Sequence, residues 1–290
     1  MKVSRSSKTA EQMALSRAIE TRKALHERIC FDPFAERFLS AKYKLPLFAR
    51  PLRDAVEKLI ESLFAGHHYY VIARTRYFDD FLEQRLADSP EQLVILGAGY
   101  DSRAYRFADR LGKVAVFEVD HPATSAAKKL KIQSVLCDVK NGVTYVPVDF
   151  NVEKLADKLR QSGYRDQCKT IFLWEGVTPY LSAEAVDEVL QFILSSSGPG
   201  SAVLFDYIVK DLLDGTCEMR GARNELYKMS RGAEPLTFGI VEGAAPSFLA
   251  TRGFCDAVDT GSAELKAKYF GEYQDRYVKP WWRMVHATVP

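Results

Sequence analysis

Short apolar runs alternate with stretches of helical periodicity from residue 92 onward, and this alternation limits the fold more than any other feature of the sequence. Turn-forming or capping residues bound the runs, which is typical of strands buried on both faces of a sheet. The five predicted strands cover residues 93–96, 113–120, 144–150, 170–175 and 201–207. Strands that alternate with helices in this way predict a mostly parallel, doubly wound α/β sheet.

Helix signals fill the intervals between these strands. Pro122 suits a first helical position, and Asn151 and Ser182 suit N-caps. The helix after Ser182 carries an apolar stripe: Val186, Val189, Leu190, Ile193 and Leu194. An earlier helix is predicted from a second set of apolar residues at helical spacing: Leu52, Val56, Leu59, Ile60 and Leu63. Pro147 predicts that the third strand lies near an edge, because proline cannot donate to the ladder.

The regions around the alternating core predict additions to it within a single domain. Residues 255–260 and 281–289 predict two further strands, the last of them antiparallel, which completes a seven-stranded Rossmann-like sheet. Residues 1–90 read as a helical cap that belongs to the same domain as the core of residues 91–290. Residues 208–245 are mixed and charged, and they predict a partly helical lid inserted after the fifth strand.

The composition limits the possible partners. The chain has 290 residues and a net charge of +2, which is too small to indicate nucleic acid. Its five cysteines form no C-x-x-C pair and its five histidines show no metal-ligand spacing, so we expect neither a disulfide framework nor a metal site. No run reaches the apolar length of a bilayer span, and no apolar segment follows the basic start. We therefore expect a cytoplasmic protein without a membrane partner.

The first predicted strand runs into a glycine turn in the segment VILGAGYDSRAYR, residues 94–106. Gly97 and Gly99 match two glycines of a dinucleotide-binding turn, but Ser102 stands where the third glycine belongs. Acidic residues also follow successive predicted strands, whose carboxyl ends meet at the edge of the sheet where ligands bind. These residues are Asp101, Asp120, Asp149 and Glu175.

Two cofactors fit a glycine turn that is followed by an acid. Asp120 lies 21 residues after Gly99, where a carboxylate can accept both ribose hydroxyls, although it can equally cap the helix that starts at Pro122. A dinucleotide needs the third glycine for its pyrophosphate, and acids oppose that anion. S-adenosylmethionine carries no phosphate, and its cationic sulfonium and ammonium groups suit Asp101 and Glu175. The sequence therefore favours S-adenosylmethionine, with the next acid and aromatic placed at the adenine: Asp149 and Phe150.

Several segments occur in the order and at about the spacing found in one enzyme family. They are YVIARTRYFDDFL, VILGAGYDSRAYR, FEVDHP, VPVDF, WEGVTPYL and LFDY. By these motifs the chain resembles the leucine carboxyl methyltransferase family, in particular its bacterial O-methyltransferase branch, over roughly residues 10–287. The resemblance implies a class I, S-adenosylmethionine-dependent methyltransferase, and some members of this branch modify polyketides or other small molecules.

The resemblance also implies roles for single residues. Arg74 matches the arginine that pairs with the cofactor's carboxylate, and Glu175 matches the acid near its amino group. Tyr180 matches a position near the transferred methyl group or the acceptor. The other matched positions are the turn under the methionine moiety, the ribose acid and the adenine pair: Gly97 and Gly99, Asp120, and Asp149 with Phe150.

Several of these residues also suit a purely structural role. Arg74 and Arg76 share a predicted helix with acids three to five residues away, so pairs along that helix account for both, and we expect Arg76 to be structural. Tyr180 can be a packed aromatic, and His286 in the apolar run MVHATV can be a core histidine. Tyr180 and His286 are nevertheless the two candidate catalytic residues, with His286 as the candidate base.

Two functions of other classes remain open at this point. One is an NAD-dependent oxidoreductase, against which the missing third glycine and Asp101 count. The other is a non-catalytic protein that keeps the cofactor fold, against which Arg74 and Asp120 count. For a methyltransferase, the predicted acceptor is a small, largely apolar molecule with a carboxyl or hydroxyl oxygen, such as a polyketide or a carboxylic acid. The charges of residues 208–245 nearly balance, which does not suit an anionic protein tail.

Overall fold

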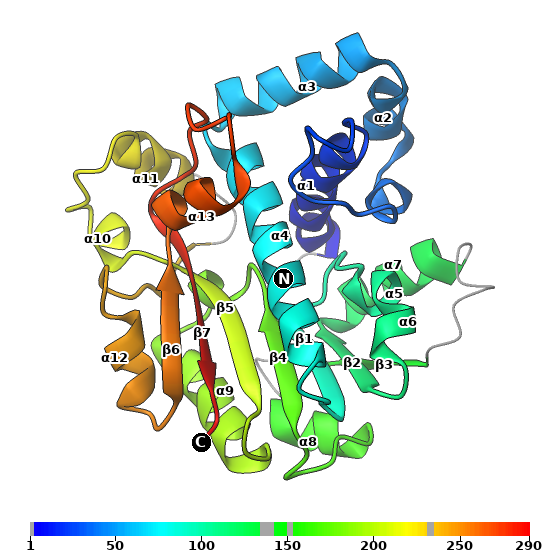
Figure 1. The fold of residues 1–290 in the computed structure, drawn as a ribbon, viewed down its shortest axis with the longest axis vertical. Helices are drawn as coiled ribbons and strands as arrows, with labels where there is room; N and C mark the ends of the chain where they lie inside the picture. Colours follow the sequence, from blue (N-terminus) through cyan, green and yellow to red (C-terminus); the bar gives the residue numbers. More distant parts are fainter. Residues whose placement is uncertain (1–2, 134–141, 150–152, 231–234) are drawn as a thin grey trace.

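The computed structural model describes residues 3–133, 142–149, 153–230 and 235–290. Within them, seven strands form one sheet in the order β3-β2-β1-β4-β5-β7-β6 (Figure 1). The strands are β1 Gln92–Leu96, β2 Ala115–Asp120, β3 Val143–Pro147, β4 Thr170–Trp174, β5 Ala202–Ile208, β6 Cys255–Thr260 and β7 Trp282–Thr288. β1 to β5 pair in parallel, whereas β7 runs antiparallel to β5 and β6. The predicted seven-stranded, mostly parallel α/β sheet is confirmed.

The burial of the central strands explains why their apolar runs are easily recognised in the sequence. Every residue of β1, β4 and β5 is buried, because helices cover both faces of the sheet at its centre. β3 lies at one edge, as Pro147 predicted. The strand order reverses between β1 and β4, whose last residues, Leu96 and Trp174, are paired. This reversal is the position at which open α/β sheets bind ligands, beyond the carboxyl ends of the strands.

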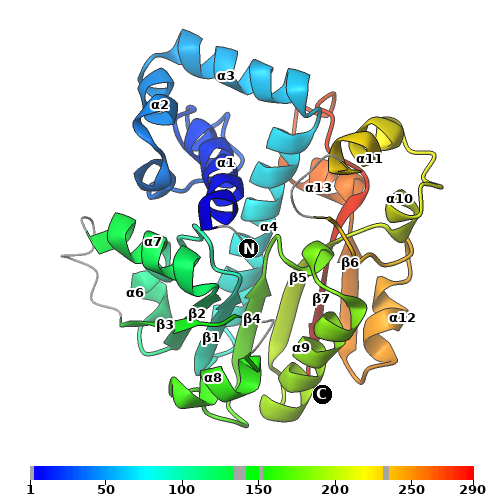
Figure 2. The ribbon, with the colours of Figure 1, turned by 180° about the vertical axis from the view of Figure 1, so that it is seen from behind.

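Helices pack on both faces of this sheet (Figures 1 and 2). One face is covered by α4 His67–Leu86, α5 Arg103–Arg106, α6 Ala108–Leu111, α7 Pro122–Gln133 and α13 Ser262–Tyr269. The other face is covered by α8 Leu155–Gln161, α9 Ala183–Ser196 and α12 Ala245–Ala250. The predicted cap of α9 is confirmed, because the Ser182 hydroxyl accepts a hydrogen bond from the Ala185 amide at 3.2 Å. The other predicted cap, Asn151, lies outside the described residues.

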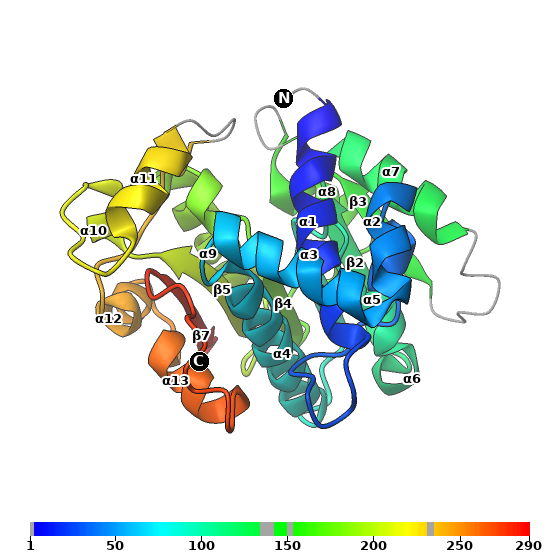
Figure 3. The same ribbon diagram turned by 90° about the horizontal axis from the view of Figure 1, so that it is seen from above.

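The first ninety residues are helical, as predicted. They form α1 Val3–Thr21, η1 Ala35–Phe38, α2 Ala41–Lys44, η2 Leu45–Phe48 and α3 Arg50–Leu63, followed by α4. The elements from α1 to α3 lie beyond the carboxyl ends of the parallel strands (Figures 1 and 3), whereas α4 packs on one face of the sheet. Among the described helices, none is long and apolar enough to cross a membrane.

The periodic apolar residues of α3 form a helix, as predicted, and they differ in burial. Val56 and Ile60 pack against the core, whereas Leu52 and Leu59 are more than half exposed. The charged residues of the same helix explain the difference, because several of them face the protein instead of the solvent.

The insertion after β5 is partly helical, as predicted. It contains α10 Lys210–Leu213 and α11 Ala222–Ser230, and it rejoins the body through a bridge between Val209 and Ile240. Thr237 donates its amide to the Pro179 carbonyl at 2.7 Å. The insertion therefore rests on the turn that follows β4, η4 Thr178–Tyr180.

Candidate functional site

The turn after β1 has the geometry that its two glycines predict. Gly97 and Gly99 have φ angles of 65° and 39°, a region that suits glycine. A Cβ on Gly97 would lie 2.2 Å from a methyl carbon of Val177, so a larger residue cannot fit there without displacing that side chain. Ser102, at the third position, is buried and bonds to Arg106. The helix that follows, α5, has only four residues and offers a poor N-terminus for a pyrophosphate.

Asp120 ties the end of β2 to this turn. Its carboxylate accepts hydrogen bonds from the amides of Gly99 at 2.5 Å and His121 at 2.6 Å. Burial raises the pKa of Asp120, and these two amides only partly offset that effect. A carboxylate has further lone pairs, so Asp120 can still accept from a ligand hydroxyl. Asp149 follows β3, which pairs with β2, whereas Phe150 lies outside the described residues.

Arg74 lies at the centre of a buried ionic network. It reaches from α4 to the ends of β4 and β5, where Nε donates to Glu175 at 3.0 Å and Nη1 donates to Asp206 at 2.6 Å. Its third nitrogen, Nη2, has a much weaker acceptor, the Met13 sulphur at 3.7 Å. Gly176 lies beside the guanidinium with a φ angle of 73°, a region that suits glycine. Arg74 is therefore held by two carboxylates and retains donor capacity at one nitrogen.

Arg103 extends the network to the glycine turn. Its guanidinium donates to Asp101 at 2.5 Å, to Glu175 at 2.6 Å and to Asp79 at 2.7 Å. Burial opposes the ionisation of Asp101, but the charges of Arg103 and Lys128 outweigh it and lower the pKa of Asp101 to about 2. Burial also opposes the ionisation of Glu175, and Arg103 and Arg74 lower its pKa in the same way. Both strand-end acids are therefore ionised at neutral pH.

The network also fastens α1 over the turn. Arg17 donates to Asp32 at 2.8 Å and to the carbonyl of Tyr100, next to Gly99, at 2.6 Å. Arg106 donates to Asp79 at 2.8 Å. Among the described residues, ion pairs link four arginines with five carboxylates, one more acid than base: Arg17, Arg74, Arg103 and Arg106, with Asp32, Asp79, Asp101, Glu175 and Asp206.

The two candidate catalytic residues lie in different surroundings. Tyr180 ends the short turn after β4 and is 37% exposed, on the same edge of the sheet as Glu175. His286 lies within β7 opposite Leu204 of β5, and its Nδ1 is 3.2 Å from the Tyr77 hydroxyl. Burial, together with Arg85 and Lys268, lowers the pKa of His286 to about 4. The structure thus brings Tyr180 to the predicted edge and leaves His286 within the sheet.

Sequence reasoning proposed only three members of the network as site residues, Arg74, Asp101 and Glu175; Asp206 and Arg103 are among those it missed. Asp206 is fully buried within β5, where it also accepts from the Tyr70 hydroxyl at 3.0 Å and the Gly176 amide at 2.6 Å. The sequence signal for Asp206 is that it is the one charged residue in the apolar run SAVLFDY. A charge buried in a strand requires an oppositely charged or hydrogen-bonding partner. Arg103 gave no comparable signal. Arg76, expected to be structural, is half-exposed and pairs with Asp80 at 2.7 Å.

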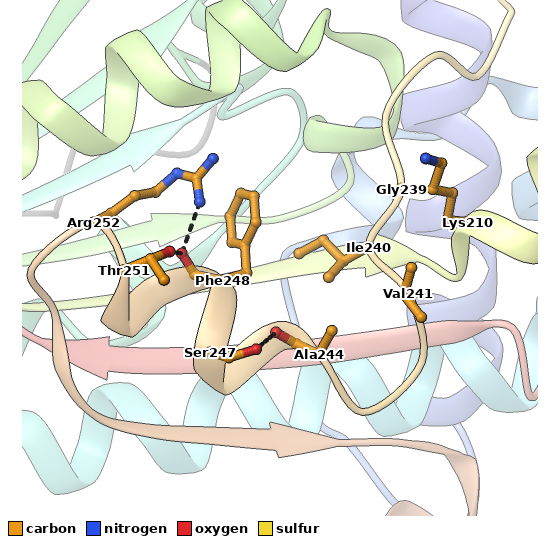
Figure 4. Close-up of a pocket in the computed structure, with 9 residues that line it drawn as sticks. All are labelled: Lys210, Gly239, Ile240, Val241, Ala244, Ser247, Phe248, Thr251 and Arg252. Atoms are coloured by element: carbon orange, nitrogen blue, oxygen red, sulfur yellow. Dashed lines mark hydrogen bonds between the residues drawn. The ribbon is translucent and has the colours of Figure 1, made fainter.

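Two surface cavities lie away from this network. One, of about 370 Å³, is formed by α12 and residues 239–241 (Figure 4). The Arg252 guanidinium at its rim bonds to the Phe248 carbonyl and to Asp187. The other, of about 540 Å³, is lined by residues 215–224 of the insertion. Neither is lined by a residue predicted to bind the cofactor.

The sheet order, the antiparallel β7, the glycine turn after β1 and the acid at the end of β2 together define the class I methyltransferase fold. The chain belongs to the leucine carboxyl methyltransferase family, whose model matches residues 10–194. This assignment confirms the family that the sequence motifs suggested.

Individual proteins agree with this assignment. A Bacillus subtilis protein named "Putative S-adenosyl-L-methionine-dependent methyltransferase YktD" is 32% identical over 56% of this chain, which corresponds to only about half of that protein, 52%. A Frankia alni protein of the same description is 33% identical over 69% of this chain and 68% of its own length. A solved O-methyltransferase family protein from Burkholderia thailandensis shares the fold, with a TM-score of 0.50 and 14% identity over 92% of this chain and 76% of its own. At the level of the family, the predictions of methyltransferase activity and of S-adenosylmethionine as cofactor are confirmed.

Proposed function

We propose that this protein transfers a methyl group from S-adenosylmethionine to a carboxyl or hydroxyl oxygen of a small, largely apolar acceptor. The observation that carries the proposal is the ionised, acid-rich edge of the sheet around the glycine turn, with Arg74 at its centre. An excess of negative charge suits a cofactor with a cationic sulfonium and ammonium, whereas it opposes a pyrophosphate.

The residues of this edge fit the cofactor by the chemistry of their donors and acceptors. Arg74 Nη2, whose present acceptor is a sulphur atom, can donate to the cofactor's carboxylate. Glu175 can accept from its ammonium group, and Asp120 can accept from its ribose hydroxyls. Asp149, at the end of β3, can accept from the adenine amino group. We assign the cofactor to these four residues and to the turn at Gly97 and Gly99.

When bound, S-adenosylmethionine would supply an electrophilic methyl carbon to which the acceptor oxygen bonds as the carbon–sulphur bond breaks, with the neutral thioether of the demethylated cofactor as the leaving group. The protein then has to align the acceptor oxygen with that methyl group and to exclude water, and alignment alone can supply a large part of the rate. We assign the exclusion of water to the cap of residues 1–90 and to the lid of residues 208–245. Arg17 fastens the cap to the turn, and Thr237 fastens the lid to η4, next to Tyr180.

The location of His286 favours a carboxyl over a hydroxyl acceptor. A carboxylate is ionised at neutral pH and needs no base, whereas an alcohol or phenol needs one. His286 lies within the sheet and its pKa is lowered to about 4, so it is a weak base away from the strand ends. Tyr180 is assigned to contact with the acceptor rather than to proton transfer.

Product mass tests this proposal directly. The protein is incubated with S-adenosylmethionine and a panel of small carboxylic acids and phenols, and each product is examined for one added methyl group. A carboxylate acceptor should give a rate that is nearly flat between about pH 6 and 9, because it is fully ionised throughout, and His286→Ala should leave that rate nearly unchanged. A rate that rises steeply with pH, or that collapses in His286→Ala while the cofactor still binds, would instead assign a hydroxyl acceptor and a histidine base.

A further inference from the structure

The cap helix α3 leaves part of its apolar stripe in solvent, although Val56 and Ile60 pack against the core, and it turns two charged side chains, Arg53 and Glu57, toward the protein. Leu52 and Leu59, seven residues apart and therefore on one face, are 55% and 58% exposed. The element before it, η2, adds Leu45 and Phe48, which are 71% and 69% exposed. We call these four side chains the outer face. η2 directly precedes α3 and packs against it, so the four exposed side chains lie on neighbouring elements. Large apolar patches on monomeric soluble proteins often mark an interaction site.

The inner side of α3 is fixed by specific polar contacts, so the helix is held in this orientation. Arg53 is buried and donates to the Arg22 carbonyl at 2.8 Å. Glu57 pairs with Lys23 at 3.1 Å and accepts from the Tyr69 hydroxyl at 3.2 Å. If α3 rotated about its axis to bury Leu52 and Leu59, the hydrogen bonds and ion pairs of Arg53 and Glu57 would break. The protein therefore stabilises the exposed apolar face through its ionic contacts.

The charges around the outer face are predominantly positive. Lys42, Arg50 and Lys58 are exposed, whereas Glu57 is turned inward. Arg50 is paired with Glu27 at 3.7 Å and with Asp54 at 3.8 Å, so the positive charge of the rim rests mainly on Lys42 and Lys58. An apolar face with a basic rim is complementary to an anionic surface with an apolar interior. Two copies of this chain would bring like charges together at the rims, which disfavours self-association through the same face.

We propose that the outer face docks on a bilayer that contains anionic lipids. α3 has 14 residues, which is too short to span but suits a helix that lies in the interface. It forms the outermost edge of the molecule, on the side of the carboxyl ends of the sheet (Figures 1 and 2). The sequence led us to expect no membrane partner, because no apolar run reaches the length of a bilayer span. The helical periodicity does not show which side of α3 faces solvent.

Docking through this face would turn the predicted active edge toward the bilayer, from which an apolar acceptor can enter. That consequence rests on the proposed function, whereas docking itself does not. The two are therefore tested separately, with vesicle binding measured without cofactor or acceptor.

The test is sedimentation of the full chain with phosphatidylcholine vesicles that contain or lack phosphatidylglycerol. The protein should sediment with the anionic vesicles, and added salt should weaken that binding. The variant Leu52→Glu with Leu59→Glu should reduce partitioning by at least about tenfold, because two apolar side chains lose their burial. The matched control is Leu130→Glu on α7, where the leucine is 72% exposed on another part of the surface, and it should partition like the unchanged protein.

Size-exclusion chromatography with light scattering gives the oligomeric state, which distinguishes docking on a bilayer from dimerisation through the same face. A monomer that binds anionic vesicles through the two leucines supports the proposal. A dimer that Leu52→Glu with Leu59→Glu dissociates, without vesicle binding, would overturn it in favour of a second copy of the chain. A monomer that binds neither kind of vesicle, or equal loss of binding in Leu130→Glu, would also overturn it.

Discussion

The buried pair of Arg74 and Asp206 makes a quantitative prediction about stability. In Asp206→Asn the side chain keeps its shape but loses its charge, so Arg74 retains only Glu175, which it shares with Arg103. The change removes a charge-assisted hydrogen bond of about 1.5–3 kcal/mol and disturbs the bond to the Tyr70 hydroxyl, about 1 kcal/mol. Asn also places an amide donor where one carboxylate oxygen accepted, opposite either the Gly176 amide or the Arg74 guanidinium, so a buried donor loses its acceptor. This brings the expected loss to about 3–5 kcal/mol.

Urea denaturation followed by circular dichroism measures this loss as a change in the free energy of unfolding. The slope of that free energy against urea should stay the same, because the surface exposed on unfolding does not change. Arg76→Gln, which breaks the half-exposed pair with Asp80 on the same helix, is the matched control and should cost less than about 1 kcal/mol. The double variant Arg74→Met with Asp206→Leu should lose less than the two single losses added together. The reasoning fails if Asp206→Asn costs no more than Arg76→Gln.

Two further changes test the ligand edge and the charge buried beneath it. Asp120→Ala should weaken the binding of S-adenosylmethionine by about 1–3 kcal/mol in a titration, because a ribose acceptor is lost; unchanged affinity would remove Asp120 from the site. Burial raises the pKa of Glu118 to about 7, although its pair with Lys128 opposes this, so the folded state holds a proton that the unfolded chain releases above its ordinary pKa of 4.5. The contribution of Glu118 to the free energy of unfolding should therefore be greatest below about pH 4.5. That contribution should fall by up to about 3 kcal/mol as the pH rises through 7. Glu118→Gln should lose that component, and equal falls in both proteins between pH 5 and 8 would contradict the assignment.

The fold could be predicted because its strands, one helix cap and one edge strand each leave a pattern in a short stretch of sequence. The strands at the centre of the sheet are buried on both faces, so their apolar runs are continuous and easily seen. The cap at Ser182 and the edge position of Pro147 each depend on a property of one residue, a hydroxyl acceptor or a missing donor. These properties affect only the residues next to them in the chain. They can therefore be recognised in the sequence without knowledge of the tertiary structure.

Contacts between distant residues could not be predicted in the same way. Asp206 and Arg74 lie 132 positions apart, and each has oppositely charged residues much nearer in sequence with which it could pair instead. The orientation of α3 depends on Arg22, Lys23 and Tyr69, which lie outside that helix. The depth of His286 within the sheet depends on the register of β7 against β5, which an apolar run does not specify. The sequence thus identified the strand ends that gather at the site but not the pairing among their side chains.

The central claim is that the edge formed by Gly97, Gly99, Asp120 and Glu175 binds S-adenosylmethionine. Isothermal titration of the purified protein with S-adenosylmethionine, its demethylated product and NAD tests it most directly. We predict saturable binding of the first two ligands and no heat of binding with NAD. Tight binding of NAD, with no response to S-adenosylmethionine, would contradict the claim.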